Sequence, residues 1–153
     1  MDVWGKVDDA EILGALKRLI SLGRNPEPAM RDIATLGESS TRLRFRTETG
    51  PDGKRWKPSL RVQLYGGKTL TKDAHLSGSV SSNHGRDFAE WGVNRVYAAI
   101  QQFGGRAGRK VGKFGPLRGA IIPARPYLGV SSDDARDILD ILQRRIDGAA
   151  HAG

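Results

Sequence analysis

Apolar positions near the start of the chain predict an amphipathic helix from about Asp8 to Leu22. They recur at intervals of three and four residues, the spacing that gathers side chains on one face of a helix. Asp8 is the expected N-cap, and Gly23 is expected to end the helix. The apolar face consists of Ile12, Leu13, Leu16, Leu19 and Ile20.

A second helix is expected from Pro28 to about Phe45. A proline suits the first turn of a helix because the missing N–H would have no partner there. Gly37 and the pair Ser39-Ser40 have low helix propensity and weaken the prediction in the middle. The apolar face consists of Met30, Ile33, Leu36 and Leu43.

The period of the pattern changes between Thr47 and Val93. Apolar residues alternate with longer polar ones from Leu60 to Tyr65, which predicts a strand with one buried face. Two further short strands flank Asn83-His84-Gly85, a tripeptide typical of a tight hairpin turn. These strands are Ser79-Val80-Ser81 and Phe88-Ala89-Glu90-Trp91.

A third helix is expected to begin after Ser131, because Asp134 stands three residues later and completes a capping box. Its apolar face is Ala135, Ile138, Leu139, Leu142 and Ile146. We therefore expect an α+β fold in a single domain over residues 1–153. It has N-terminal helices, a small antiparallel sheet with a hairpin, a long basic loop, and a C-terminal helix packed on the sheet.

Positive charge dominates the composition, with 25 Lys and Arg against 17 Asp and Glu and a net charge of +8. Residues 105–118 have no acidic side chain, and we expect a mobile basic loop there. Its cations are Arg106, Arg109, Lys110, Lys113 and Arg118. With Arg42, Arg44 and Arg46 they could neutralise several phosphates of a nucleic acid. Contact of the loop with solvent or with protein explains the same charges.

Several classes of protein are excluded or disfavoured. The chain has no cysteine, so disulfides and thiolate chemistry are impossible. No apolar run is long enough to span a membrane, and the first residues lack the pattern of a signal peptide. The histidines lack metal-ligand spacing, and the glycine-rich loop does not match a P-loop. We predict no catalytic residues, no metal and no cofactor.

One acidic cluster was weighed against this conclusion. His84, Asp87 and Glu90 could form a nuclease-like metal site. However, a hairpin turn requires the same tripeptide around His84, so the structural explanation is preferred. His75, His84 and His151 are therefore interpreted as solvent-exposed loop histidines.

Four local patterns occur in one order along the chain. They begin at Pro51 (PDGKRW), Leu70 (LTKDAHLSGSV), Tyr97 (YAAIQQFGG) and Ile122 (IPARPYLG). Together they resemble the phage virion morphogenesis family, also called tail completion proteins, of Mu-like phages and prophages. The resemblance covers about residues 28–147, and its last two segments are the most specific.

The resemblance implies a structural protein of a tailed phage that acts in tail completion and head–tail joining, at the neck or the head-proximal tail end. Its expected location is the virion, after assembly in the host bacterial cytoplasm. Expected partners are further copies of itself in a ring, the connector, tail terminator and tail tube proteins, and genomic DNA passing through the channel. No membrane partner is expected. A packing or interface role is implied for Tyr97, Phe103, Gly104, Pro123, Arg125, Pro126 and Tyr127.

The residues around Arg125 support such a role on physical grounds. Pro123 and Pro126 restrict the backbone on both sides, so the guanidinium loses little entropy when it binds. A carboxylate, in the same subunit or in a neighbour, would suit it. Binding of a loop within the subunit is the equal alternative.

The basic loop has two expected partners in a virion, the DNA channel and an adjacent ring of protein. Contact with DNA should be weak and salt-sensitive, because tight binding would impede ejection. The alternative function is a small basic nucleic-acid-binding module, which the charge favours and the four ordered patterns do not.

Overall fold

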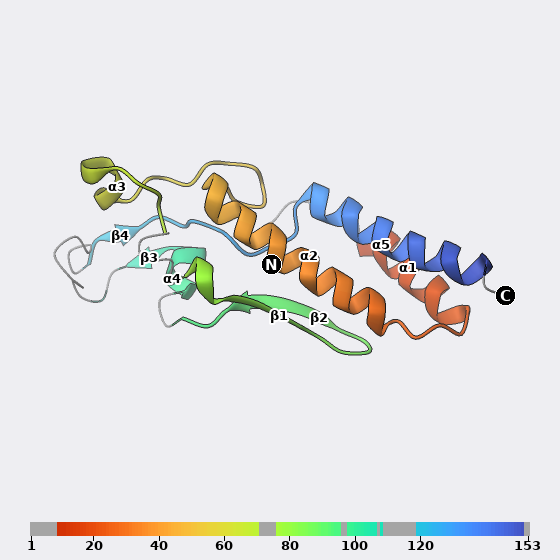
Figure 1. Ribbon diagram of the computed structural model, residues 1–153. Coiled ribbons are helices and arrows are strands. Elements are labelled where there is room, and N and C mark those ends of the chain that lie inside the picture. Colours follow the sequence, from red (N-terminus) through yellow and green to blue (C-terminus); the bar gives the residue numbers. More distant parts are fainter. Residues whose placement is uncertain (1–8, 71–75, 96–97, 107, 109–118, 152–153) are drawn as a thin grey trace. The chain divides into compact units, whose positions relative to one another are not determined.

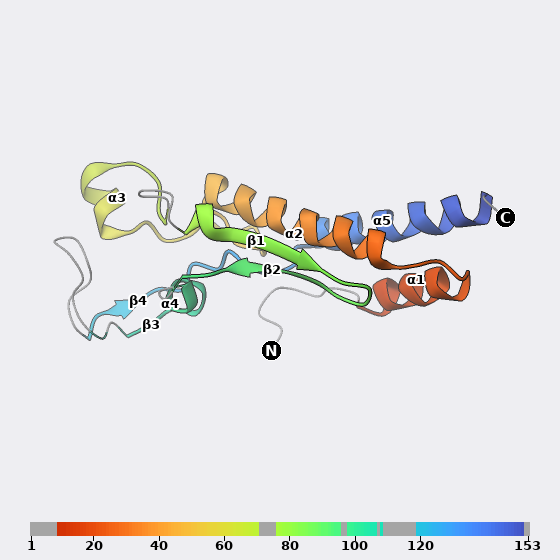
Figure 2. The ribbon, with the colours of Figure 1, turned by 60° about the horizontal axis from the view of Figure 1, so that its bottom comes forward.

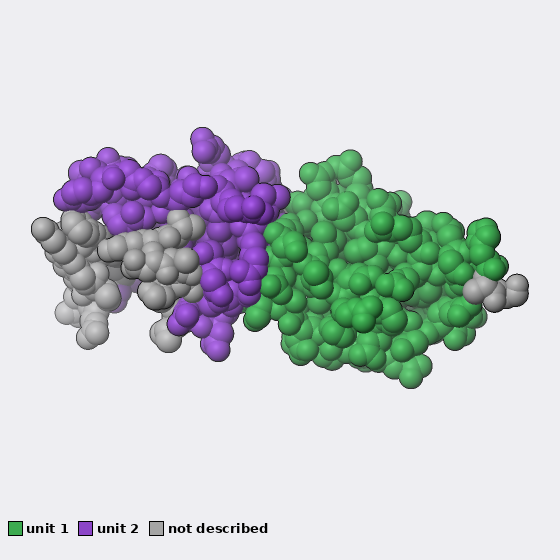
Figure 3. Space-filling view, in the orientation of Figure 1, with its two compact units in different colours: residues 1–40, 81–92, 130–153 green, residues 41–80, 93–129 purple. Residues whose placement is uncertain are grey.

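The protein is described here by a computed structural model, which covers residues 9–70, 76–95, 98–106, 108 and 119–151. The chain divides into two compact units (Figure 3). The first comprises residues 1–40, 81–92 and 130–153, and the second comprises residues 41–80 and 93–129. Neither unit is a continuous stretch of sequence. A single domain over residues 1–153 stays a prediction.

The first unit is built on helices α1 (Asp9–Ser21), α2 (Glu27–Thr47, up to Ser40) and α5 (Ser132–His151). Figure 1 shows α1 and α5 side by side. The apolar faces of the three helices meet in one core, which confirms the three predicted helices. The buried members of this core are Ala15, Leu19, Ala29, Met30, Ile33, Ile138 and Leu142.

Helix α2 continues through the residues that weakened its prediction. Gly37 is required there because a Cβ atom would lie 2.1–2.4 Å from ring atoms of Trp91. Ser40 donates a hydrogen bond from its hydroxyl to Oδ1 of Asp134 at 2.6 Å. Gly37 and Ser40 therefore serve packing inside the first unit, and these tertiary contacts outweigh the local cost in helix propensity.

The predicted hairpin is present, formed by β1 (Val80–His84) and β2 (Ala89–Val93), and Figure 2 shows the strands side by side. Its turn was misplaced in the prediction. Asn83 and His84 belong to β1, and the turn closes where the N–H of Gly85 donates to the carbonyl of Phe88 at 3.0 Å. Ala89 and Trp91 of β2 pack against the core that contains α5.

Helix α5 begins with the predicted capping box. The N–H of Asp134 donates to Oγ of Ser131 at 3.0 Å, and the N–H of Ser131 donates to Oδ2 of Asp134 at 2.9 Å. Two backbone donors at the start of the helix are thereby satisfied, so local sequence alone determines where α5 starts.

The second unit contains α3 (Leu60–Tyr65), a 3₁₀ turn η2 (Ser77–Ser79), α4 (Ala98–Phe103), β3 (Gly105–Arg106) and β4 (Ile121–Ile122). Strands β3 and β4 pair antiparallel, with Gly105 opposite Ile122 and Arg106 opposite Ile121. The buried core of this unit is Phe45, Trp56, Leu76, Val80, Ala98 and Tyr127.

The strand predicted from Leu60 to Tyr65 is wrong, because these residues form helix α3. Oγ of Ser59 accepts from the N–H of Val62 at 3.4 Å and caps the helix, and Gly66 with φ of 74° ends it. The pattern also places Leu60 and Leu64 four residues apart, on one helical face. No residue of α3 is buried, so no core contact imposes a strand.

The mixture of helices and small antiparallel sheets confirms the α+β class. Over the described residues, no helix combines the length and apolarity needed to cross a bilayer.

Candidate functional site

Residues 123–129, here called the anchor segment, follow β4 in the second unit and contain the most specific sequence pattern. Two of its side chains are buried although they carry polar groups, with 7% of Arg125 and 1% of Tyr127 exposed. Buried polar groups need hydrogen-bond partners, so the contacts of these side chains show what the segment is built to do.

Gln102 of α4 binds the backbone of the anchor segment. Its Oε1 accepts from the N–H groups of Tyr127 and Leu128, both at 3.0 Å, and its Nε2 donates to the carbonyl of Leu128 at 3.0 Å. One buried side-chain amide thus makes the backbone hydrogen bonds that a neighbouring strand would make in a sheet. Gln102 was not among the residues predicted from the sequence, and its place within the specific YAAIQQFGG pattern is the signal that marks it.

Tyr127 inserts between elements of the second unit. Its hydroxyl donates to the carbonyl of Ala98 at 2.8 Å, and its ring lies 5.2 Å from the ring of Phe45. Phe45 contacts Trp56 edge to face at 5.5 Å. Nε1 of Trp56 in turn donates to the carbonyl of Pro126 at 2.6 Å, so the aromatic cluster also binds the segment by its backbone.

Arg125 binds groups of its own subunit. Nε donates to the carbonyl of Lys57 at 2.6 Å, Nη2 to that of Pro58 at 3.4 Å, and Nη1 to Oε1 of Gln101 at 3.4 Å. Burial lowers the pKa of the Arg125 guanidinium, which nonetheless stays charged at physiological pH. Among the described residues, no carboxylate lies within ion-pair distance of Arg125. Of the two predicted roles, Arg125 therefore has the internal one, in which it binds a loop of its own subunit at residues 57–58.

Arg44 of α2 completes the arrangement. Its Nη1 donates to the carbonyls of Tyr127 at 3.0 Å and Gly129 at 3.1 Å, and only 5% of the residue is exposed. Arg44 was considered as a possible phosphate ligand, and its burial excludes that role. Arg42 is exposed, and its Nη2 donates to the carbonyl of Val80 at 2.7 Å.

Gly104 permits close approach of the chain after α4. Its φ is 72°, and a Cβ atom would lie 2.8 Å from the nitrogen of Ala124 and from the carbonyl oxygen of Ile122. Neighbouring Phe103 is 60% exposed. Pro123 and Pro126 are half-buried, and Tyr97 lies outside the described residues. An interface role for these residues stays a prediction.

The predicted basic loop is joined to the anchor segment through the β3–β4 ribbon. Arg106 is exposed on β3, and its Nη1 donates to the carbonyl of Gly119 at 3.5 Å. The other cations of the predicted loop lie outside the described part of the chain: Arg109, Lys110, Lys113 and Arg118. The expected mobility of the loop therefore stays a prediction. The first two residues of the predicted loop are instead strand, because Gly105 and Arg106 pair with Ile122 and Ile121 of β4.

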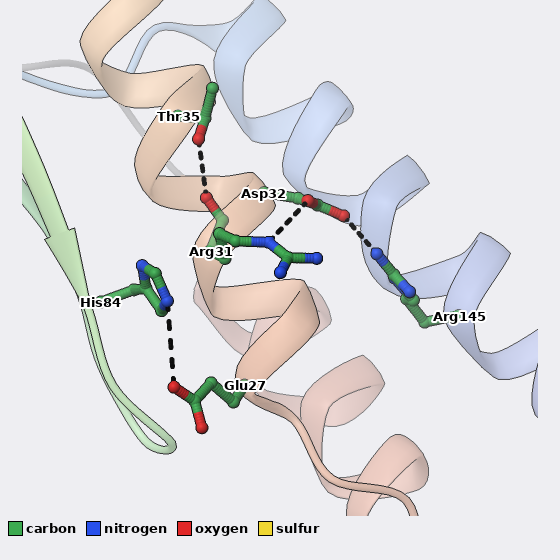
Figure 4. Close-up of polar contacts among 6 residues, drawn as sticks. All are labelled: Glu27, Arg31, Asp32, Thr35, His84 and Arg145. Atoms are coloured by element: carbon green, nitrogen blue, oxygen red, sulfur yellow. Dashed lines mark hydrogen bonds and ion pairs between the residues drawn. The ribbon is translucent and has the colours of Figure 1, made fainter.

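Two members of the candidate metal cluster, His84 and Glu90, have partners in the first unit. Nε2 of His84 lies 3.8 Å from Oε1 of Glu27 (Figure 4), and Asn83 donates to Glu90 at 3.1 Å. Within the described residues, no three histidine or acidic side chains group as metal ligands do. The prediction that the histidines lie in exposed loops is wrong for two of them, because His84 is a half-buried residue of β1 and His151 is in α5, where its ring contacts the carbonyl of Asp147. His75 lies outside the described part.

Comparison of the sequence with known proteins identifies its family. The sequence model of the phage virion morphogenesis family matches residues 7–147. The chain belongs to this family. Among its relatives, the Mu-like prophage FluMu G protein 2 of Haemophilus influenzae is 36% identical over 133 residues, 87% of each chain. The "Putative capsid assembly protein G" of Escherichia phage Mu is 32% identical over 158 positions, 97% of each chain. No solved structure gives a significant match.

Membership of the phage virion morphogenesis family confirms the resemblance found in the sequence, and the match extends into α1, which the resemblance had left out. The two most specific patterns bind each other: one is the anchor segment itself, and the other lies on α4 and contacts it. The α4 pattern supplies Gln101 and Gln102, and the anchor segment supplies Arg125 and Tyr127. The pattern is therefore explained by mutual packing inside the second unit.

Proposed function

We propose that this virion morphogenesis protein is a structural, non-catalytic component of a tailed phage that acts in tail completion and head–tail joining. Its place would be the neck or the head-proximal end of the tail. The observation that carries the proposal is the family match over residues 7–147. The relative from phage Mu is named for capsid assembly, which agrees with a role in building the particle.

The geometry of the anchor segment supports a structural role. Its buried polar side chains bind backbone groups of the same unit, as Gln102 and Arg125 do. Such bonds rigidify a framework. A rigid framework is what an assembly protein needs, because each subunit must present the same surface to its neighbours.

The partners we propose are further copies in a ring, the connector, tail terminator and tail tube proteins, and the genome that passes through the channel. The β3–β4 ribbon would hold the base of the basic loop, and a ring of such loops would present many weak phosphate contacts. Screening by salt keeps such contacts weak enough for DNA to move.

A stop codon early in the gene tests the proposal in a phage or prophage that carries it. We expect filled heads to accumulate apart from tails, or tails with abnormal ends, in electron micrographs of lysates. Supply of the intact gene from a plasmid should restore joined particles. Intact, infectious particles from the stop-codon phage would refute a role in joining.

A further inference from the structure

Positive charge is concentrated in the second unit of the chain. That unit, purple in Figure 3, holds 16 of the 25 Lys and Arg but three of the 17 Asp and Glu, which gives it a net charge of +13. The first unit holds the other nine cations and 14 acidic residues, a net charge of −5. The predicted basic loop contributes five of the 16 cations, so most of the positive charge of the second unit lies outside the loop.

Several exposed cations of this unit flank a pair of buried rings. Phe45 of α2 contacts Trp56, and both residues belong to the core of the second unit. Arg55 forms an antiparallel bridge with Thr49, so the backbone is extended there. Neighbouring side chains of an extended segment point to opposite sides, so burial of Trp56 turns Arg55 outward. The exposed cations of this region, here called the basic surface, are Arg46, Lys54, Arg55, Lys57 and Lys68.

Hydrogen bonds hold the three segments of the basic surface together at Glu48. Its carbonyl accepts from the N–H of Trp56 at 2.7 Å, and its Oε1 accepts from the N–H of Thr69 at 2.6 Å. Nζ of Lys68 donates to the carbonyl of Arg46 at 2.6 Å, although the two residues are 22 positions apart. The cations of the basic surface therefore stand close together on a fixed backbone framework.

The acidic side chains described in this unit do not neutralise the basic surface. Glu48 accepts from a backbone N–H, and Oδ1 of Asp52 accepts from the backbone N–H of Lys54 at 3.0 Å. Among the described residues, no carboxylate lies within ion-pair distance of any cation of the basic surface. Five neighbouring charges of one sign without carboxylate partners attract a polyanion.

We propose that the basic surface binds the sugar–phosphate backbone of double-stranded DNA, independently of its sequence. Three of the five cations are lysines, which are depleted from protein–protein interfaces and bind phosphates as point charges. An acidic protein that also covers Leu60 and Leu64, exposed on α3, is the other occupant that the test includes. The inference rests on the proposed function, in which the genome passes through a channel, and adds a contact separate from that of the basic loop.

Binding of the purified full chain to a labelled DNA duplex over a series of salt concentrations tests the proposal. The variant combines Arg46→Gln, Lys54→Gln, Arg55→Gln and Lys57→Gln. Among the described residues, none of these four side chains has a hydrogen-bond or ion-pair partner, so the fold should be kept, which circular dichroism verifies. We expect the slope of log affinity against log salt to become shallower by about 3–4, and the affinity at low salt to fall about tenfold or more.

The matched control removes four exposed cations from the first unit instead, with Lys17→Gln, Arg18→Gln, Arg31→Gln and Arg144→Gln. It lowers the net charge by the same amount and should change the slope by less than about 1. An equal loss in the control would overturn the proposal, because net charge alone would then explain binding. Failure of the unmodified chain to bind the duplex at low salt would overturn it as well.

A third variant separates the basic surface from the basic loop. It combines Arg106→Gln, Arg109→Gln, Lys110→Gln and Lys113→Gln. If this variant loses binding while the basic-surface variant binds DNA as the unmodified chain does, the loop is the DNA contact and the proposal is overturned.

Particle assembly distinguishes failure of this inference from failure of the proposed function. If the basic-surface variant binds DNA normally but does not join heads to tails, the surface contacts an acidic protein and the proposal is overturned. If the stop-codon phage yields intact particles, the proposed function fails, whereas a loss of DNA binding confined to the basic-surface variant still supports the DNA contact.

Discussion

Replacement of Gln102 by leucine measures how much of the second unit depends on one side chain. The glutamine is 5% exposed and makes three hydrogen bonds to the anchor segment, two as acceptor and one as donor. Leucine has similar size but no polar atom. It therefore removes the bonds without opening a large cavity, and the backbone groups of Tyr127 and Leu128 lose their partner.

The expected cost follows from those groups. A buried polar group left without a partner costs about 1–3 kcal/mol. Burial of the added apolar surface recovers about 1–2 kcal/mol. Three backbone groups lose a partner, and the gain from apolar burial is subtracted from their summed cost. Since Leu128 is half-buried and water can reach part of its backbone, the net loss of stability should lie near the lower end of that sum. We expect the free energy of unfolding of the second unit to fall by about 2–4 kcal/mol.

Amide hydrogen exchange is the direct assay, since it reports opening at single residues. Exchange at Tyr127 and Leu128 should accelerate about 30-fold or more, which corresponds to a loss of about 2 kcal/mol. The matched control is Gln63→Leu, the same chemical change at an exposed residue of α3 with a single bond to Pro58. It should change stability by no more than about 0.5 kcal/mol. Equal effects of the two substitutions would refute the reasoning.

Three further predictions concern stability and can be checked by urea unfolding. Tyr127→Phe removes a buried hydroxyl and keeps the ring contact, so we expect a loss of about 1–2 kcal/mol. Gly37→Ala should cost about 1–3 kcal/mol because its Cβ meets the Trp91 ring, whereas Gly14→Ala, with open space in α1, should stabilise by about 0.5–1 kcal/mol; the same sign for both would contradict the packing argument. Ser131→Ala should cost about 1 kcal/mol through loss of the α5 cap, and unchanged unfolding would show that the cap contributes nothing.

Local sequence was sufficient wherever the determining interactions lie within a few residues. The apolar stripes of α1, α2 and α5 predicted these helices within a few residues of their ends. Ser131 and Asp134 also identified the start of α5, because both members of a capping box stand in one turn. The family resemblance was visible for a related reason, since its patterns are short and ordered along the chain.

Tertiary structure decided the features that depend on distant residues. The alternating run from Leu60 to Tyr65 forms a helix, because its apolar residues suit a helical as well as a strand period and, among the described residues, no strand pairs with it. Arg44 was considered as a possible phosphate ligand from its charge alone. Its burial against the carbonyl of Tyr127, 83 positions later, could not be deduced from residues near it.

The anchor segment shows where the division lies. The sequence by itself identified residues 123–129 as a specific pattern and expected Pro123 and Pro126 to restrict the backbone on both sides of Arg125. Only the fold brings Gln102 and the 57–58 loop to that segment and determines that Arg125 binds carbonyl oxygens of its own unit. The physical reason is that backbone restriction is encoded locally, whereas the partner of a buried polar group depends on which distant segments pack beside it.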